Sequence, residues 1–313
     1  MKLLAPDVVP WAPIEGVELA TFTPRNGLPE AHLDAEILVL WGVSPTLVRD
    51  AAARMPGLRL VQGLMAGTDV MESAGFAPEV ALCSGVGLHD EPVTEHTLAL
   101  ILAAARRLDL AVRAQQEHRW AKELGGLQPM DNSGSFTTLR GARVLLWGFG
   151  SIGQSLAPHL SALGASVRGV ARSEGTRSGY TVLAERVLDA ALPGTDLLVM
   201  LLPATDATRR VLDARRLSLL PAHAWVVNTG RGVTVDESAL VDALRSGTIG
   251  GAALDVTEVE PLPAGSPLWD APDLILTPHG AGGRPLGYEE LVRDNVAALL
   301  EGRSLRNVVR AAR

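Results

Sequence analysis

Short apolar runs alternate with helical patterns along the chain. Four such runs lie in the first third, at residues 17–22, 35–40, 58–62 and 80–83. From residue 143 a second set follows, at 143–147, 166–170, 196–201, 224–228, 251–255 and 274–276. Strands that alternate with helices are typical of parallel βαβ units. The pattern therefore predicts an α/β fold with two sets of parallel strands.

Helical periodicity and end signals place several helices. A long helix is predicted from Glu95 to near Trp120, and its apolar stretch is only about half as long as a membrane span, which indicates a buried helix. Asp236 is the predicted N-cap of a helix that Gly247 ends. A last helix is predicted at 289–300, and the Gly-, Ser- and Asn-rich segment 125–138 is a predicted loop.

The composition is typical of a soluble enzyme. The length of 313 residues exceeds what one small core needs and suits two domains. The net charge of −7 disfavours binding to nucleic acid or to an anionic membrane. Cys83 is the one cysteine, so no intrachain disulfide can form, which fits a reducing cytosol. The first residues hold no sustained apolar region, so we expect a cytoplasmic protein without a signal peptide.

A glycine pattern lies between the strand at 143–147 and the helical run at 152–163. Gly148 permits a tight turn, Gly150 lets the backbone approach a pyrophosphate, and Gly153 lets helix and strand pack closely. The helix N-terminus would face the phosphates. A purely structural turn is the alternative interpretation. The pattern predicts a dinucleotide site formed by Gly148, Phe149, Gly150, Ser151, Ile152 and Gly153.

The end of the next strand bears on which dinucleotide binds. NAD enzymes usually place Asp or Glu there to accept hydrogen bonds from the ribose, whereas this chain has Ala171, Arg172 and Ser173. Arg172 and Ser173 would face a 2′-phosphate that a carboxylate would repel. NADP(H) is therefore the predicted cofactor. NAD(H) remains the alternative, because Arg172 could be an ordinary surface residue and Glu174 is close by.

Arg231, Glu260 and His279 each lie just past the end of a predicted strand. In an open parallel sheet the carboxyl ends of the strands face the ligand crevice. A lone His is ordinarily structural, but these three together supply a cation for a carboxylate, a proton-transfer group and a carboxylate that tunes it. This set suits hydride transfer to a 2-oxo acid or from a 2-hydroxy acid.

Two further turns leave alternatives open. Asp255 ends a predicted strand and would either bond the nicotinamide amide or cap the turn that follows. The turn at 64–69 contains Ala66 and Gly67. Its backbone N–H groups would bind a substrate carboxylate, or it is an ordinary turn.

With these residues in view, the chain resembles the D-isomer-specific 2-hydroxyacid dehydrogenases along essentially its whole length, and among them the glyoxylate/hydroxypyruvate reductases. The resemblance rests on the glycine pattern and on Ala66-Gly-Thr-Asp69, Thr94-Glu-His96, Leu202-Pro203 with Thr208, Asn228–Gly232, Leu254-Asp-Val256, Glu260-Pro-Leu-Pro263 and Pro278-His279.

The resemblance implies two doubly wound parallel-sheet, Rossmann-like domains. These would be a discontinuous, flavodoxin-like substrate-binding domain at 1–93 and 284–313, and a Rossmann dinucleotide-binding domain at 94–283. It also implies that Arg231 binds the carboxylate and carbonyl of the substrate, that His279 is the general acid/base, and that Glu260 orients His279. A homodimer is expected on the same ground. The remaining site residues that it implies are Leu202, Pro203, Thr208, Thr229, Gly230, Arg231, Asp255, His279 and Gly280 for the cofactor, and Ala66, Gly67, Arg231 and His279 for the substrate.

Three places depart from the family's usual pattern. Ala171 replaces the usual acid, Gly280 follows the His where Ile or Val is more frequent, and residues 83–90 lack the usual Asn-containing stretch. The first leaves the choice of cofactor open, and the other two leave the substrate open.

We therefore predict an NADP(H)-preferring reductase of a small 2-oxo acid such as glyoxylate or hydroxypyruvate, with no metal in its chemistry. One alternative is an NAD-dependent D-3-phosphoglycerate dehydrogenase of the short type. It would need cations near the 64–69 turn, where the sequence offers little beyond Arg54 and Arg59. A dinucleotide-sensing corepressor-like binding protein is the alternative of another class, which the full set of Arg231, Glu260 and His279 disfavours.

Overall fold

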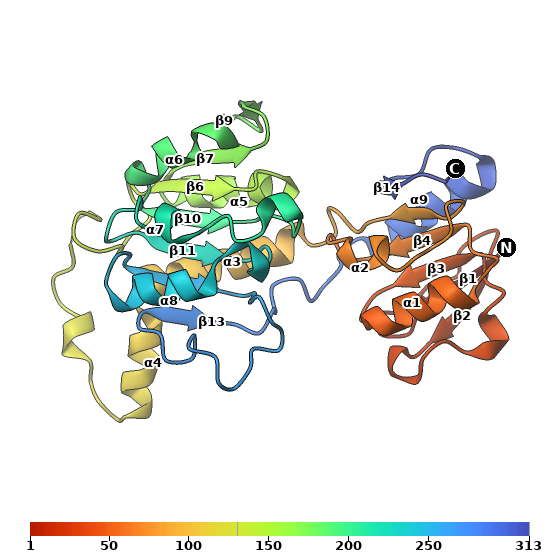
Figure 1. The fold of residues 1–313 in the computed structure, drawn as a ribbon, viewed down its shortest axis with the longest axis horizontal. Coiled ribbons are helices and arrows are strands. Elements are labelled where there is room, and N and C mark those ends of the chain that lie inside the picture. Colours follow the sequence, from red (N-terminus) through yellow and green to blue (C-terminus); the bar gives the residue numbers. More distant parts are fainter. Residues whose placement is uncertain (130, 313) are drawn as a thin grey trace. The chain divides into compact units, whose positions relative to one another are not determined.

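The computed structural model describes residues 1–129 and 131–312, which form two compact α/β units (Figure 1). Unit 1 comprises Met1–His89 together with the chain from Arg284 onward, and unit 2 comprises Asp90–Gly283. Unit 2 begins at Asp90 because helix α3 (Asp90–Ala105) begins there, whereas the sequence predicts a boundary between residues 93 and 94.

The sheet of unit 1 has the order β14-β5-β4-β3-β1-β2 and is parallel except for β14, which runs antiparallel to β5. Its strands are β1 (Lys2–Pro6), β2 (Glu18–Phe22), β3 (Ile37–Leu40), β4 (Leu60–Gly63), β5 (Ala81–Cys83) and β14 (Val308–Arg310). The apolar pattern did not indicate β1, because the run of Leu3, Leu4 and Ala5 is short and is closed by Pro6.

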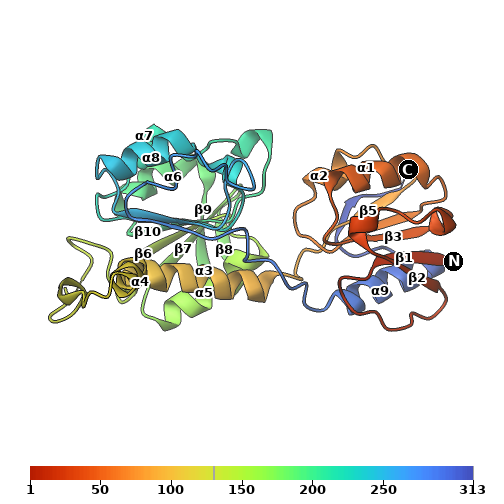
Figure 2. The ribbon, with the colours of Figure 1, turned by 90° about the horizontal axis from the view of Figure 1, so that it is seen from below.

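Helices cover both faces of this sheet, as a doubly wound fold requires (Figure 2). Helix α1 (Pro45–Arg54) packs Leu47 and Val48 into one core, close to the short helix α2 (Asp69–Glu72). Helix α9 (Tyr288–Glu301) packs Leu291 and Val292 into the core on the other face. The last helix of the chain is therefore part of the core of the N-terminal unit.

The sheet of unit 2 has the order β13-β12-β11-β10-β6-β7-β9-β8. It is parallel except for the hairpin of β8 and β9. Its strands are β6 (Arg143–Trp147), β7 (Ser166–Ala171), β8 (Gly175–Arg177), β9 (Tyr180–Ala184), β10 (Leu197–Met200), β11 (Trp225–Asn228), β12 (Gly251–Leu254) and β13 (Leu274–Leu276). The predicted α/β class with two mainly parallel sheets is confirmed.

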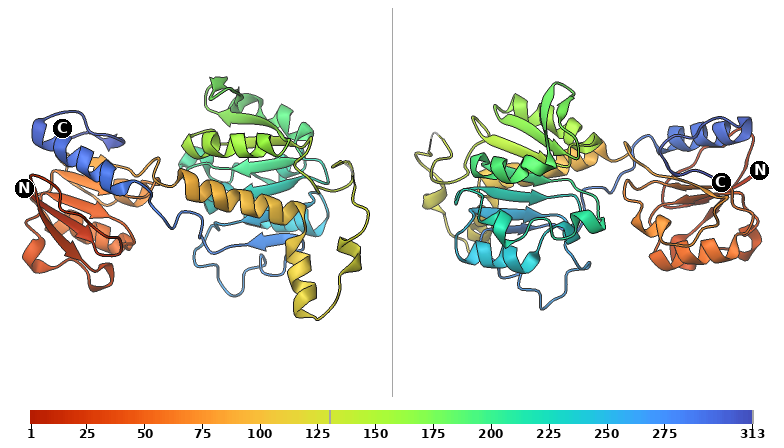
Figure 3. Two further views of the ribbon diagram at one scale, coloured as in Figure 1. Left: turned by 180° about the vertical axis from the view of Figure 1, so that it is seen from behind. Right: turned by 45° about the horizontal axis from the view of Figure 1, so that its top comes forward.

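Two helical layers enclose this second sheet (Figures 2 and 3). Helices α3 and α5 (Ser151–Ala162) pack together on one face, and the apolar stretch of α3 is buried there. The other face is covered by α6 (Leu188–Ala191), α7 (Ala214–Leu217) and α8 (Glu237–Arg245). Asp236 caps α8 by accepting a hydrogen bond from the Ala239 N–H, and Gly247 follows its end with φ +68°.

The predicted long helix from Glu95 to Trp120 is wrong in its extent. The structure has α3 and a separate α4 (Leu108–Gln116), with Arg107 in the left-handed conformation between them. The Arg107 guanidinium lies 2.5 Å from Asp273 and over the ring of Trp225, and these contacts accompany the turn of the chain. Helix α4 and the segment after it extend away from the sheet (Figure 3).

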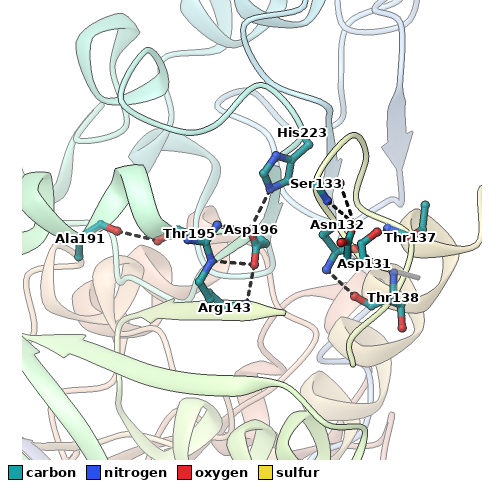
Figure 4. Close-up of polar contacts among 10 residues, drawn as sticks. All are labelled: Asp131, Asn132, Ser133, Thr137, Thr138, Arg143, Ala191, Thr195, Asp196 and His223. Carbon is teal, nitrogen blue, oxygen red and sulfur yellow. Dashed lines mark hydrogen bonds and ion pairs between the residues drawn. The ribbon is translucent and has the colours of Figure 1, made fainter. Parts of the chain in front are cut away.

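An ionic cluster around the buried Asp196 lies where β6, β10 and β11 begin (Figure 4). The Asp196 carboxylate accepts hydrogen bonds from the Arg143 guanidinium at 2.6 and 3.0 Å and from His223 Nε2 at 2.8 Å. Burial opposes ionisation, but these contacts lower the pKa of Asp196 to about 2. Asp196 is therefore ionised at neutral pH and joins the starts of three neighbouring strands.

The segment 125–138 is irregular where the structure describes it, in agreement with the predicted loop. Its second half is held by Asn132, whose side chain bonds the backbone of Thr137 and Thr138 (Figure 4). Across residues 1–129 and 131–312, none of the helices combines the length and apolar character needed to cross a bilayer.

Candidate active site

The carboxyl ends of three adjacent strands of unit 2 bring the predicted chemistry together. Strands β11, β12 and β13 are parallel neighbours, so their carboxyl ends share one edge of the sheet. Arg231 follows β11, Asp255 and Glu260 follow β12, and His279 follows β13. Short loops after these strands therefore present all four side chains from the same edge.

His279 and Glu260 form a direct pair. His279 Nδ1 lies 2.6 Å from Glu260 Oε2, and the other carboxylate oxygen accepts a hydrogen bond from the Thr257 N–H at 3.0 Å. The hydrogen bond to Glu260 raises the pKa of His279. Burial opposes ionisation of Glu260, but the contact with His279 lowers its pKa overall. The pair therefore favours an imidazolium beside a carboxylate.

The same pair borders a cavity of about 640 Å³. Most of its remaining wall is apolar and includes Leu262, Trp269 and Leu276. A cavity of this size can hold a small organic molecule beside the imidazole, whose side chain is 46% exposed.

Arg231 is held by its backbone in a turn that Asn228 organises. The buried Asn228 side chain donates to the Arg231 carbonyl at 3.1 Å and accepts from the Gly230 N–H at 3.0 Å. Arg231 lies close enough to Glu260 and His279 that its charge lowers the pKa of both groups. Gly232 is required next, because a Cβ there would lie 2.0 Å from the carbonyl carbon of Thr257.

Asp255 secures the loop that carries His279. Its side chain is almost fully buried and accepts hydrogen bonds from the Thr277 hydroxyl at 2.6 Å, the Gly280 N–H at 2.9 Å and the Ala281 N–H at 3.0 Å. The sequence leaves a nicotinamide contact and a turn cap open for Asp255. In the structure both of its oxygens bond the 277–281 turn, which is distant in sequence from Asp255.

The glycine pattern has the geometry of a dinucleotide cradle. It joins β6 to α5, and Ser151 and Ile152 form the start of that helix. Gly148 has φ +103°, and a Cβ there would lie 2.7 Å from the Leu201 carbonyl. A Cβ at Gly150 would meet none of the described atoms within 4 Å, so its backbone is open to a ligand. These features fit a pyrophosphate at the N-terminus of α5.

Beyond the end of β7 the structure adds a second arginine to the predicted site. Ala171 ends the strand, and Arg172 and Ser173 are exposed after it. The β8–β9 hairpin returns Arg177 to this place, where its guanidinium lies 3.0 Å from the Ser173 hydroxyl and 3.3 Å from the Phe149 carbonyl. Glu174 pairs with Arg186 at 2.8 Å. The strand end is therefore cationic.

The remaining predicted cofactor residues lie along the same sheet edge. Leu202 and Pro203 follow β10, and the Thr208 hydroxyl donates to the Pro203 carbonyl at 2.6 Å. The Thr229 hydroxyl lies 2.8 Å from that of Thr97 on α3. A Cβ at Gly230 would lie 2.8 Å from the backbone of Leu202, which ties this turn to the end of β10.

Ala66 and Gly67 belong to unit 1. They follow the carboxyl end of β4 and precede α2. Their place at the carboxyl edge of a parallel sheet is the usual ligand-binding edge of that sheet.

Comparison with known proteins gives a consistent result. A family model described as "D-isomer specific 2-hydroxyacid dehydrogenase, NAD binding domain" matches residues 98–281. Glyoxylate reductase of Aeropyrum pernix is 34% identical over 265 residues, which are 83% of this chain and 78% of that protein.

Solved structures extend the likeness to nearly the whole chain. A D-isomer specific 2-hydroxyacid dehydrogenase of Xanthobacter autotrophicus Py2, in complex with NADPH and MES, has a TM-score of 0.81 at 29% identity and covers 98% of this chain and 97% of its own. The NADPH-dependent glyoxylate/hydroxypyruvate reductase of Sinorhizobium meliloti, in complex with NADP and sulfate, has a TM-score of 0.81 at 27% identity and covers 98% of each chain.

Proposed function

Since the chain belongs to the D-isomer specific 2-hydroxyacid dehydrogenase family of NAD(P)-dependent oxidoreductases, we propose that it reduces a small 2-oxo acid, such as glyoxylate or hydroxypyruvate, with NADPH. The observation that carries this proposal is the His279–Glu260 pair at 2.6 Å, with Arg231 close enough to shift the pKa of both.

Arg231 is the substrate-binding cation in this proposal. Its planar guanidinium can bind a carboxylate with two parallel hydrogen bonds and can polarise the neighbouring carbonyl. Within unit 1, the backbone N–H groups of Ala66 and Gly67 would bind a substrate carboxylate. In this scheme unit 2 is the dinucleotide-binding domain and unit 1 is the substrate-binding domain.

His279 is the proton donor for reduction. Its Nδ1–H is directed to Glu260, which leaves Nε2–H to protonate the carbonyl oxygen of the substrate. When bound, the dinucleotide supplies the hydride. Glu260 keeps the imidazole protonated and oriented, because its carboxylate stabilises the positive charge.

The cofactor site favours NADPH over NADH. Its glycine cradle, Gly148–Gly153, fits the pyrophosphate that both dinucleotides share. At the end of β7, Arg172, Ser173 and Arg177 offer cations and a hydroxyl to a 2′-phosphate, while the nearby Glu174 is paired with Arg186. The solved relatives with NADPH or NADP add support for this choice.

A short D-3-phosphoglycerate dehydrogenase is the less favoured alternative. Its substrate phosphate would need cations beside the 64–69 turn, which follows β4. Arg59 precedes β4, and Arg54 ends α1, so both belong to the opposite edge of the sheet. They are also paired, Arg54 with Asp50 at 3.0 Å and Arg59 with Glu36 at 3.8 Å. A corepressor-like sensor is disfavoured because sensing does not require the proton-transfer pair.

We also propose that two copies pair through the surface of α4 and the segment after it. This surface exposes Leu108, Val112, Trp120 and Leu127, and Leu127 is fully exposed. A cavity of about 590 Å³ on the same segment is lined by Ala111, Ala114 and Trp120, among others. Exposed apolar side chains beside a cavity on one surface suit a two-fold contact, in which each copy presents the same surface.

The deciding experiment is a panel of 2-oxo acids assayed with NADPH and with NADH. We expect the highest kcat/KM for a small 2-oxo acid with NADPH. His279→Gln should lower kcat by roughly 10²–10⁴-fold while leaving NADPH binding nearly unchanged. Turnover confined to 3-phosphohydroxypyruvate with NADH would establish the phosphoglycerate alternative. Cofactor binding without turnover on any 2-oxo acid would establish the sensor.

A further inference from the structure

His96 reaches the acid/base loop from a different element. It lies on α3, and its Nε2 is 3.0 Å from the Thr277 hydroxyl and 3.2 Å from Asp255 Oδ1. The His96 side chain is about a quarter exposed, whereas that of Asp255 is 1% exposed. A helix on the face of the sheet thus contacts the two side chains that hold the turn carrying His279.

That turn has an unfavourable backbone conformation. His279 has φ +51°, in the left-handed region that residues with a Cβ seldom adopt. The bonds that hold it come mainly from Asp255. Its carbonyl accepts from the His279 N–H at 2.7 Å, and its carboxylate accepts from the next two N–H groups. The orientation of the His279 ring therefore depends on the position of Asp255.

We propose that His96 is a positioning residue for His279, which it holds in place through Thr277 and Asp255. The inference rests on the proposed function, in which His279 is the acid/base. The imidazole N–H of His96 faces the buried carboxylate of Asp255 and the hydroxyl of Thr277. That hydroxyl already donates its own hydrogen bond to Asp255. Without that donor the buried carboxylate is under-satisfied, and the turn gains freedom to move.

A small displacement of the turn has a large effect on proton transfer. A shift of about 1 Å in a reacting group can lower the rate by about a hundredfold. The charged groups that act on His279 are Glu260, Arg231 and Asp255. Since the bond to Glu260 is the main cause of the raised pKa of His279, loosening the turn should weaken this bond and lower that pKa.

Two variants test the proposal. His96→Leu removes the donor with little change in size, and Thr277→Val removes the hydroxyl between His96 and Asp255. Each should lower kcat by about 10- to 100-fold, move the alkaline limb of the pH profile to lower pH, and leave the Kd for NADPH unchanged. His96→Gln retains an N–H donor near the position of Nε2 and should restore most of the activity and the original pH profile.

His223→Leu is the matched control. His223 makes the same kind of contact with a buried Asp, at 2.8 Å, but at the strand starts, on the opposite edge of the same sheet. It should lower stability without moving the pH profile. If His96→Leu behaves as His223→Leu does, or if His96→Gln rescues nothing, the positioning role is wrong.

A titration of the His279 ring by NMR separates this inference from the proposed function. The His279 signal is assigned as the one that disappears in His279→Gln. In His96→Leu this signal should titrate at a lower pH than in the unmutated protein, whether or not His279 is catalytic. An unchanged titration would overturn the positioning role, whereas an active His279→Gln enzyme would overturn the proposed function.

Discussion

Glu260 acts on the proposed chemistry through the charge of its neighbour. The 2.6 Å contact raises the pKa of His279 above its ordinary value. Reduction of a 2-oxo acid consumes the proton of the imidazolium. The rate of reduction is therefore highest at low pH and falls as the pH rises through the raised pKa of His279. Oxidation of the 2-hydroxy acid needs the neutral imidazole and should show the opposite dependence.

Glu260→Gln removes the carboxylate charge and keeps an oxygen that accepts the hydrogen bond. We expect the alkaline limb of kcat/KM for 2-oxo acid reduction to move to lower pH, because the imidazolium loses its main stabilising charge. Profiles measured with saturating NADPH for both proteins check this shift. A limb at the same pH in the variant would show that Glu260 does not set the pKa of the proton donor.

We expect the cofactor preference to depend on the residues after β7. Ala171→Asp with Arg172→Ala supplies an acceptor for the ribose hydroxyls and removes a partner of the 2′-phosphate. The ratio of kcat/KM for NADPH to that for NADH should fall by about 10- to 100-fold, since a hydrogen bond to a charged group contributes about 1.5–3 kcal/mol. Adding Arg177→Ala should lower the ratio further.

Arg168→Ala is the control for these cofactor variants, because Arg168 lies on the same strand within its span. The ratio should stay unchanged in that variant. A ratio that is insensitive to all three site substitutions would remove the strand end from cofactor selection.

At the scale of single residues, the sequence could indicate the proposed reacting groups but not the side chains that hold them in place. Arg231, Glu260, His279 and the glycine pattern are recognisable because their types and spacing carry the chemistry. Thr277 and His96 make hydrogen bonds to residues that only the fold brings near. The sequence does not place Arg177 either, because the hairpin that brings it close to Phe149 has no strong apolar signal.

Among the elements, the central strands of unit 2 could be predicted, whereas the short strand β1 and the break between α3 and α4 could not. The central strands β6, β10, β11 and β12 are short apolar runs between turn signals, and their predicted positions agree with the structure within a residue or two. No Gly or Pro marks the break between α3 and α4 in the sequence. The break coincides with contacts of the Arg107 side chain to Asp273 and Trp225, which are distant in sequence.

The cluster at the starts of β6, β10 and β11 makes the stability of unit 2 depend on pH. Asp196 has a folded pKa of about 2, below its ordinary value of 3.8. Its contribution is therefore present above about pH 4 and is lost as the pH falls through the folded pKa. Asp196→Asn should lower the free energy of unfolding by about 2 kcal/mol at pH 7, and the difference should shrink below pH 4.

Urea unfolding followed by tryptophan fluorescence at several pH values measures this difference. Asp189→Asn is the matched control, because Asp189 is 41% exposed and pairs with Arg215 and Arg216 at the surface. That variant should lose about 0–1 kcal/mol. Equal losses of unfolding free energy in the two variants would show that the burial of Asp196 adds nothing to the contribution of its ion pair.

For the whole molecule, length and alternation predict two α/β units, and the structure has them. The return of the chain to unit 1 after Gly283 cannot be derived from those patterns, because α9 and β14 look like any terminal helix and strand. Only the resemblance to a family implied it, and the membership of the chain in that family is confirmed by the comparisons.

The proposed pairing of two copies has its own test. Val112→Asp with Leu127→Asp places charges on the apolar surface of α4 and the segment after it. The unmutated protein should have twice the mass of one chain in light scattering, and the double variant should have the mass of a single chain. Val8→Asp changes an apolar residue of unit 1 that is 52% exposed, and it should keep the doubled mass. A monomeric unmutated protein would exclude the pairing.

The divided unit 1 also sets an order for folding during synthesis. Its second part, α9 and β14, leaves the ribosome after the whole of unit 2 has been made. At about 5–20 residues per second, residues 90–283 take roughly 10–40 s. Through this interval Gln62 lacks its partner Asn295, and the sheet face that α9 covers, which includes Leu3, Ile37 and Leu60, is open to solvent or to a chaperone. We therefore expect unit 2 to complete its fold first, although unit 1 contains the start of the chain.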